Sequence, residues 1–412
     1  MTAGSRGDVA PFTGLGHGLA LAGHEVTLVT HARFEPLAAR AGLRFHPLPV
    51  DPRAELESSR GRGLHRSATG VGKLVRVVAM ARALAGRMTD DLVAAARASD
   101  ALLLAGPLGP VGHAVAEGLS LPSLGVHLQP LAPTREFAPP LLGVGSWGAV
   151  GNRAAGMGVC LAVEQVFAAA VPEVRSRLGL PRIRPAAALR TRERQRWPVF
   201  HGFSPLVVPR PRDWRAGLDV AGYWWPYDED AQLPSRLRDF LDAGPAPVFV
   251  GLGSATVPDP ERLSAAVVRA LRTAGLRGVV QRGWAGLSAT GDDMLTVDEV
   301  PHSALFPRTA AVVHHAGAGT TAAGLRAGVP AVPVPIQFDE GFWAARLVAL
   351  GVAPRAVPLR RLTSEALASA LARATRDSAY RERAETLGTR IRAENGIEPV
   401  LDAVNRLADR GN

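Results

Sequence analysis

The residues best suited to chemistry form the run HHAGAGTT at positions 314–321, between a short apolar segment and an expected helix. Gly317 and Gly319 would let the backbone approach an anion closely, and the N–H groups that open a helix point at such a ligand. His315 can donate a hydrogen bond to a phosphate oxygen, and Thr320 can cap the helix and donate another. A glycine-rich cap with two core histidines is the alternative, but this combination of residues favours a diphosphate site.

Two further segments could complete that site. Ser254 follows the glycine turn VGLG at 250–253, which also lies between an expected strand and helix, so it could contact the same diphosphate from the opposite side. Many α/β loops share this pattern. Asp339 and Glu340 follow the apolar strand that ends at Val334. Acidic side chains at the carboxyl end of a parallel strand suit sugar hydroxyls and repel phosphate, although an ordinary surface turn has the same composition.

These loops need a scaffold of alternating strands and helices, and the chain provides one in each half. Short apolar runs bounded by glycine or proline predict buried strands, and the segments between them predict helices. The pattern predicts an α/β protein with two doubly wound, Rossmann-like parallel-sheet domains, and 412 residues suit two domains. The expected strands are 25–30, 101–104, 124–126, 248–251, 278–281, 311–314 and 331–334, and the expected helices are 14–22, 112–119, 260–274 and 320–327.

The domain boundaries follow from changes in composition. A Pro- and Trp-rich linker is expected, and its DED run at 228–230 has the DxD spacing of metal-dependent nucleotide-sugar enzymes, but its hydrophilic setting favours a solvated charge run. Only Met1–Ala3 precede the first functional loop at 4–8, so we expect either a truncated first strand or a start codon further upstream. The expected units are an N-terminal domain at 1–208, the linker at 209–247, a C-terminal domain at 248–395 and a final helix at 396–412 that packs back on the first domain.

Composition and charge exclude several classes of protein. Hydrophobic residues make up 47% of the chain and charged residues 20%, which excludes a disordered chain. The net charge of +10 invites a nucleic-acid partner, but the arginines are spread singly along alanine-rich stretches, so none is expected. Cys160 is the only cysteine, which rules out a disulfide framework or a cysteine zinc cluster and favours the cytoplasm. The apolar stretch 154–171 is interrupted by Glu164 and Gln165, so at most peripheral membrane contact is expected.

Residues 300–343 resemble the donor-binding box of family-one glycosyltransferases, with VPH at 300–302, the histidine-glycine run and FW at 342–343. The branch most similar to this sequence is that of sterol glucosyltransferases and their antibiotic-glycosylating relatives, such as the vancomycin group. GSRGDV at 4–9 and TREF at 134–137 extend the resemblance over nearly the whole chain. It implies the GT-B fold: two facing Rossmann-like domains, with the acceptor in the first, the donor in the second and the reaction in the cleft.

The same resemblance implies two catalytic carboxylates. Asp8 falls at the position of the general base, and a carboxylate with an ordinary pKa of about 3.9 is ionised at neutral pH and can accept the proton of the acceptor hydroxyl. A plain helix cap is the alternative for Asp8, because aspartate is a preferred capping residue. Asp339 is the second carboxylate, as a ligand of the sugar hydroxyls and a possible helper.

The resemblance also assigns the donor and acceptor contacts. His315, Gly317, Gly319, Thr320 and Ser254 would hold the diphosphate of a UDP- or dTDP-hexose, and Asp339 and Glu340 its sugar. Val300 would contact the base through its backbone, and Trp284 would lie near the nucleotide ring unless it is a core tryptophan. Thr134 and Phe137 would contact the acceptor. No metal is expected, because the helix terminus and the imidazole take the charge of the leaving diphosphate.

Two positions depart from the family pattern. Ala316 stands where a third glycine is common, which is tolerable only if its φ is negative. Glu340 stands where glutamine is common, which removes a donor to the sugar and adds a charge. The implied activity is inverting transfer of a hexose to a hydroxyl of an apolar acceptor such as a sterol or polyketide. The alternative is a non-catalytic auxiliary protein of the same fold, which would be expected to lose His315 or Asp8.

Overall fold

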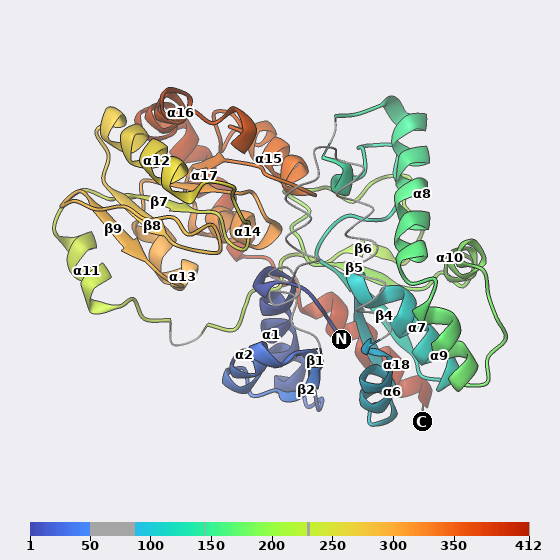
Figure 1. Cartoon of the computed structure of the whole chain (residues 1–412). Coiled ribbons are helices and arrows are strands. Elements are labelled where there is room, and N and C mark those ends of the chain that lie inside the picture. The colour runs from blue at the N-terminus through green and yellow to red at the C-terminus, as the bar shows by residue number, and fades with distance from the viewer. Residues whose placement is uncertain (50–86, 144, 229–230, 412) are drawn as a thin grey trace.

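The computed structural model describes residues 1–49, 87–143, 145–228 and 231–411 (Figure 1). It has two α/β halves, each with helices packed on parallel strands. The predicted class, α/β with two parallel-sheet units, is therefore confirmed.

The C-terminal half is built on a five-stranded parallel sheet in the order β11-β10-β7-β8-β9. Successive side chains alternate between its two faces, so Val248 and Val250 belong to one apolar layer and Phe249 to the other. Helices α12 and α16 cover the first face, and α11 and α13 the second. The elements are α11 (Ser235–Asp242), β7 (Val248–Gly251), α12 (Pro260–Ala274), β8 (Gly278–Gln281), β9 (Met294–Val297), α13 (His302–Leu305), β10 (Ala311–His314), α14 (Ala318–Ala327), β11 (Ala331–Pro333), α15 (Glu340–Ala349), α16 (Ser364–Arg376) and α17 (Ser378–Arg392).

The N-terminal half contains two groups of parallel strands, β1-β2 and β3-β4-β5-β6, that flank the first residues of the chain. The amide of Thr2 donates to the carbonyl of Val29 at 3.0 Å, and the amide of Ala105 donates to the carbonyl of Met1 at 3.0 Å. Residues 1–3 thus lie where a central strand would join the two groups, but they form no strand themselves.

Helices surround these strands. The elements are α1 (Arg6–Leu21), β1 (Thr27–His31), α2 (Glu35–Arg40), β2 (Arg44–Leu48), α6 (Thr89–Arg97), β3 (Leu102–Ala105), α7 (Gly109–Gly118), β4 (Ser123–His127), α8 (Gly148–Val166), α9 (Ala170–Arg177), α10 (Pro185–Arg194), β5 (Val199–His201), β6 (Leu218–Val220) and α18 (Glu398–Gly411).

The start of the first helix differs from the sequence prediction. It was expected at Gly14, but α1 begins at Arg6. Ser5 is its N-cap and Asp8 its third residue, and the two form a capping box that satisfies free N–H groups of the first turn. The sequence did not predict this start, because Pro11 and the glycines inside α1 are residue types that disfavour helix.

The segment 209–247, predicted as a linker, also contains regular elements. β6 extends the N-terminal sheet, and α11 packs on the C-terminal one, so the linker is shortened to the stretch between them. Of the DED run, only Asp228 lies within the described residues, and its carboxylate accepts a hydrogen bond from the Ser303 hydroxyl. The final helix α18 crosses back to the N-terminal half, where Val400 and Val404 pack in one cluster with Phe12 (Figure 1).

Candidate active site

The expected diphosphate loop lies at the carboxyl edge of the C-terminal sheet. His314 ends β10 and is the register partner of Gly251 at the end of β7, so the two glycine loops leave the sheet side by side. Gly317 is the N-cap of α14, with extended backbone, and the helix begins at Ala318. Thr320 is therefore in the first turn but is not the cap, which corrects the sequence prediction. The N–H groups of the first turn remain available to an anion.

His315 occupies a slot that only glycines can form. A Cβ atom on Gly253 would lie 2.7 Å from Cε1 of His315, and one on Gly317 would lie 2.3 Å from its Nε2. Both distances are shorter than side-chain contacts allow, so the two glycine loops hold the imidazole between them. Burial lowers the pKa of His315 to about 4, so the ring is neutral at pH 7 and approaches a phosphate as a hydrogen-bond donor.

The neighbouring His314 has a structural task. Its side chain is 1% exposed, and its Nδ1 accepts a hydrogen bond from the amide of Ala316 at 3.1 Å. Burial lowers the pKa of His314 to about 3. His314 is thus a core residue, as the alternative prediction of two core histidines had it. His315 lies between the glycine loops, as the predicted diphosphate site requires.

Ala316 adopts the backbone conformation that would favour glycine. Its φ is +67° and its side chain is fully buried. Left-handed backbone costs a residue with a Cβ about 1–2 kcal/mol, and the contact with His314 helps to hold the loop there. The loop keeps its shape at the expense of local strain.

Ser254 and Trp284 border the same loops. Ser254 is half-buried, and its hydroxyl has no partner within the part of the chain that the structure describes. The amide of Trp284 donates to the carbonyl of Gly253 at 3.1 Å, and the guanidinium of Arg33, from the N-terminal half, lies 5.4 Å from its ring centre. Val300 is half-buried beside α13, where it packs on the second apolar layer of the sheet.

Asp8 projects from the first turn of α1. One oxygen, Oδ2, accepts the amide of Ser5 at 2.8 Å and its hydroxyl at 2.9 Å. A Cβ on Gly4, whose φ is +140°, would lie 2.4 Å from that oxygen, so the turn requires glycine. Among the described residues Oδ1 has no partner. Asp8 thus takes part in a capping box, as the alternative proposed, and keeps one oxygen free to accept a proton.

Asp339 faces Asp8 from the other half of the molecule. Burial raises the pKa of Asp8, the contacts from Ser5 lower it, and repulsion from the Asp339 carboxylate raises it further. Asp339 follows Phe338, whose φ is +51°, and its Oδ2 accepts the indole N–H of Trp343 at 2.8 Å. Burial also raises the pKa of Asp339. The carboxylates of Asp8 and Asp339 thus come from opposite halves, both have a raised pKa, and the charge of Asp339 acts on Asp8.

Glu340 points back at its own loop. Its Oε2 accepts the amides of Ile336 at 2.5 Å and Gln337 at 2.8 Å, and the residue is only 6% exposed. Burial raises its pKa to about 7, against the lowering effect of those two contacts. The carboxylate holds the turn that presents Asp339, a contact that the sequence did not predict.

Thr134 and Phe137, predicted to contact the acceptor, have internal partners. The Thr134 hydroxyl donates to Oδ1 of Asp213 at 2.6 Å and accepts the amide of Glu136, and the residue is 2% exposed. The Phe137 ring packs on Phe342 of the C-terminal half, with ring centres 5.2 Å apart. Neither residue lines the apolar cavity of the N-terminal half.

A mostly apolar cavity of about 190 Å³ opens between α8, α10, the carboxyl ends of β3 and β4, strand β5 and the start of β6. It begins at Gly106, directly after β3, the strand that pairs with residues 1–3. Leu131, Met157 and Val163 of its wall lie in the stretch 131–171, whose apolar composition suits a pocket. Trp197, Trp214 and Leu218 come from separate segments, and no sequence pattern pointed to them.

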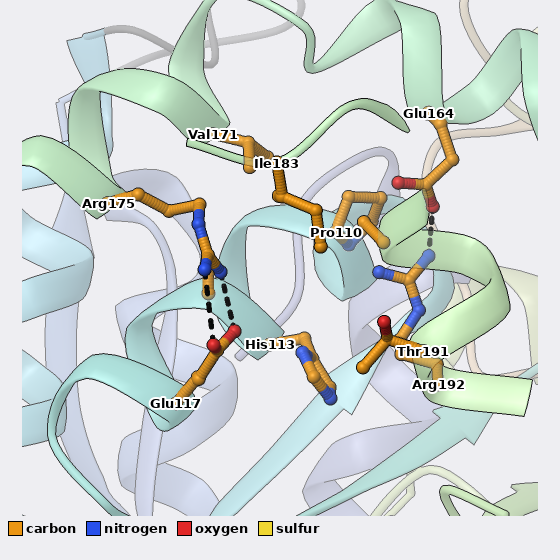
Figure 2. A pocket seen from close by; sticks show the side chains of 11 residues that line it. Pro110, His113, Glu117, Glu164, Val171, Arg175, Ile183, Thr191 and Arg192 are labelled. Atoms are coloured by element: carbon orange, nitrogen blue, oxygen red, sulfur yellow. Dashed lines mark hydrogen bonds and ion pairs between the residues drawn. The ribbon is translucent and has the colours of Figure 1, made fainter. Parts of the chain in front are cut away.

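A second, much smaller space adjoins this cavity. It measures about 20 Å³, enough for a water molecule at most, and lies among α7, α9 and α10. Figure 2 shows the ion pair of Glu164 and Arg192 on one side of it and that of Arg175 and Glu117 on the other. Glu164 and Arg192 also line the larger cavity, so their ion pair separates the two spaces.

Comparison with known proteins places this geometry in a family. Residues 1–138 match the model of the glycosyltransferase family 28 N-terminal domain, and residues 278–406 match that of the erythromycin biosynthesis protein CIII-like C-terminal domain. The chain is 38% identical over 414 residues to the O-mycaminosyltylonolide 6-deoxyallosyltransferase of Streptomyces fradiae, covering 99% of this chain and 97% of that protein. The chain is a GT-B glycosyltransferase.

Further relatives agree with this assignment. The glycosyltransferase is 32% identical over 413 residues to a sterol 3-beta-glucosyltransferase of Arabidopsis thaliana, covering 97% of this chain and 64% of that protein. Its fold matches the structure of the glycosyltransferase VinC in complex with dTDP, with a TM-score of 0.67 and 22% identity over 99% of this chain and 98% of that one. The predicted family and enzyme class are confirmed.

Two further properties of the described residues concern metals and membranes. No group of three or more His, Cys, Asp or Glu side chains among them is arranged to hold a metal ion. No single helix in the described ranges is long and apolar enough to cross a membrane. Helices α8 and α9 have enough length and apolar composition only when taken together, and they are bent by 58°.

Proposed function

We propose that this glycosyltransferase inverts the anomeric carbon as it transfers a hexose from a UDP- or dTDP-sugar to a hydroxyl of an apolar acceptor. The observation that carries the proposal is the pair Asp8 and Asp339: the two carboxylates interact from opposite halves, and α1, which carries Asp8, contacts α14, which begins at the anion-binding loop. The N-terminal half also holds an apolar cavity. The names of its relatives support a sterol or a polyketide macrolide as the class of acceptor. The lone Cys160 suits the cytoplasm.

The donor's diphosphate would lie on the first turn of α14. The N–H groups near Gly317 and Gly319 and the helix dipole favour its negative charge, and the neutral His315 donates one hydrogen bond. Ser254 and Thr320 offer hydroxyl donors on either side of it. Val300 and Trp284 would hold the nucleotide base. These groups stabilise charge that grows on the diphosphate as the sugar leaves.

The acceptor hydroxyl would be deprotonated by Asp8. Its oxygen attacks the anomeric carbon, its proton passes to Oδ1 of Asp8, and the bond between sugar and diphosphate breaks on the opposite face. A single displacement of this kind inverts the carbon. Burial and the charge of Asp339 raise the pKa of Asp8, which makes its carboxylate a stronger base than one in water. Asp339 would bind the sugar hydroxyls, and Glu340, predicted to share that task, would hold the turn that presents Asp339.

The test of the proposed function also decides whether Asp8 acts as the general base or only caps helix α1. Several UDP- and dTDP-hexoses are mixed with a panel of apolar alcohols, and products are detected by their mass. Asp8→Asn should keep donor affinity and lose turnover by about 100-fold or more, since general bases contribute about 10²–10⁴-fold. His315→Ala should instead weaken donor binding.

A matched control is Asp259→Asn, which changes another helix-capping aspartate, whose Oδ1 accepts the amide of Arg262 at 2.9 Å. It should leave turnover unchanged. Full turnover of the Asp8→Asn protein would mean that Asp8 only caps α1. The absence of hexose transfer and of donor hydrolysis with every pair would refute the proposed reaction.

A further inference from the structure

Two buried histidines form one end of the acceptor cavity. His127 ends β4 and His201 ends β5, and the two are register partners, so their side chains lie on the same face of the sheet. Their ring centres are 5.7 Å apart with the rings edge to face. Both residues line the cavity, and both Nε2 atoms are shielded from water without a partner among the described residues. A buried nitrogen left without a hydrogen bond costs stability unless a ligand supplies one.

The protonation of His201 is fixed by its surroundings. Its Nδ1 lies 3.0 Å from the carbonyl oxygen of Asp219, which can only accept, so Nδ1 carries the hydrogen. Burial lowers the pKa of His201 to about 4, so the ring is neutral at pH 7. Stacking on Trp214, with ring centres 4.5 Å apart, holds the ring in place. The Nε2 atom therefore presents a lone pair and can only accept.

His127 complements this lone pair. Burial lowers the pKa of His127 to about 3, and the ring is neutral. No hydrogen bond within the described ranges fixes its tautomer, so Nε2 can carry the hydrogen and donate. Three pairs of charged side chains on the wall are already joined in ion pairs: Glu164 with Arg192 (Figure 2), Asp213 with Arg153, and Glu193 with Arg215. Among the described residues that line the cavity, the buried side-chain atoms without a partner are thus these two nitrogens, one that accepts and one that can donate.

We infer that the histidine end of the cavity binds a second hydroxyl group of the acceptor, distinct from the one that is glycosylated. This inference rests on the proposed function and names the acceptor class more closely: an apolar molecule with at least two hydroxyls. The bound hydroxyl donates to Nε2 of His201 and accepts from Nε2 of His127. A carbonyl or ether oxygen cannot replace it, because neither has a hydrogen to offer His201.

The test uses two small probes with the same skeleton and no donor sugar. Calorimetry measures the dissociation constants of 2-naphthol, which has an O–H group, and 2-methoxynaphthalene, which has only an ether oxygen. The wild-type protein should bind 2-naphthol about 3- to 10-fold more tightly, the range expected for one hydrogen bond. In His201→Phe, which keeps an aromatic ring against Trp214, the ratio should fall to about one.

The control is His113→Phe. His113 is another half-buried imidazole, packed edge-on against Trp197 with ring centres 5.5 Å apart, and it does not line the cavity. This variant should keep the preference for 2-naphthol. Nitrogen NMR of the wild type gives a readout that needs no variant: the Nε2 signal of His201 should shift with 2-naphthol and stay unchanged with the ether.

Equal binding of the two probes, an unchanged ratio in His201→Phe, or no binding of either probe would overturn the inference. Neither measurement involves the donor or turnover, so a negative result leaves the Asp8 test intact. Conversely, if Asp8→Asn keeps full turnover, the ratio of the dissociation constants of the two probes can still be measured.

Discussion

Glu340→Gln should remove a pH-dependent component of stability that the folded structure imposes. The fold raises the pKa of Glu340 from 4.5 to about 7, because burial penalises its carboxylate more than the amides of Ile336 and Gln337 favour it. The folded protein thus binds this proton more tightly than the unfolded chain. The contribution to stability is complete below pH 4.5 and is lost as the pH rises through 7.

The magnitude follows from the size of the shift. One pKa unit corresponds to 1.36 kcal/mol, so the contribution that is lost between these pH values amounts to about 3 kcal/mol. Glutamine keeps an oxygen that can accept the same two amides and has no proton to lose in this range. Relative to the wild type, Glu340→Gln should therefore become more stable as the pH rises, by several degrees of unfolding temperature in all.

The assay is thermal unfolding of both proteins, followed by circular dichroism from about pH 5 to pH 8. The difference between the two proteins is the quantity to examine, since buried histidines such as His314 have lowered pKa values and make both proteins more stable as the pH rises. Glu261→Gln changes an exposed glutamate in the first turn of α12 and serves as the control, with a difference that stays constant. A constant difference for Glu340→Gln would refute the reasoning.

Three further predictions concern the two halves of the site. Gly317→Ala should weaken binding of UDP and dTDP in calorimetry while the protein stays folded, because the new Cβ would lie 2.3 Å from Nε2 of His315; unchanged affinity would contradict the slot. Ala316→Gly should change the free energy of unfolding by less than about 1 kcal/mol, because relief of left-handed strain is offset by the lost methyl burial and the added chain entropy. A large loss would show that the strain is not there. Thr134→Val should cost about 1–3 kcal/mol of stability by removing the donor to Asp213, while the KM values for donor and acceptor stay unchanged; a raised acceptor KM would restore the predicted contact.

The central strands and the donor loop of the C-terminal half could be predicted closely, whereas β9, α15, α16 and α17 were not predicted. β7, β8, β10 and α12 have the predicted bounds, because each is a short apolar run or a helix between Gly or Pro signals. The donor loop is equally local, since strand, glycines and helix N-terminus follow one another in the chain. The sign of φ at Ala316 was not predictable, because it depends on the contact between its amide and the His314 ring.

The N-terminal half was predicted less well for a physical reason. β5 and β6 are three residues each, too short to give a periodic signal, and α8 begins with glycines that disfavour helix. Thr134 was assigned to the acceptor from its motif, yet its hydroxyl is taken up by Asp213, 79 residues away in the sequence. Packing between distant segments decides which polar groups are left for a ligand.

The histidine end of the cavity shows why this information is absent from any local motif. The lone pair on His201 exists because its Nδ1 donates to a backbone carbonyl, that of Asp219 on the next strand. A backbone oxygen is present whatever side chain stands at position 219, so no residue type there announces the contact. The partner imidazole comes from β4, 74 residues earlier. A diphosphate site can be written in eight consecutive residues, whereas this hydroxyl site is formed only when three parallel strands align in register.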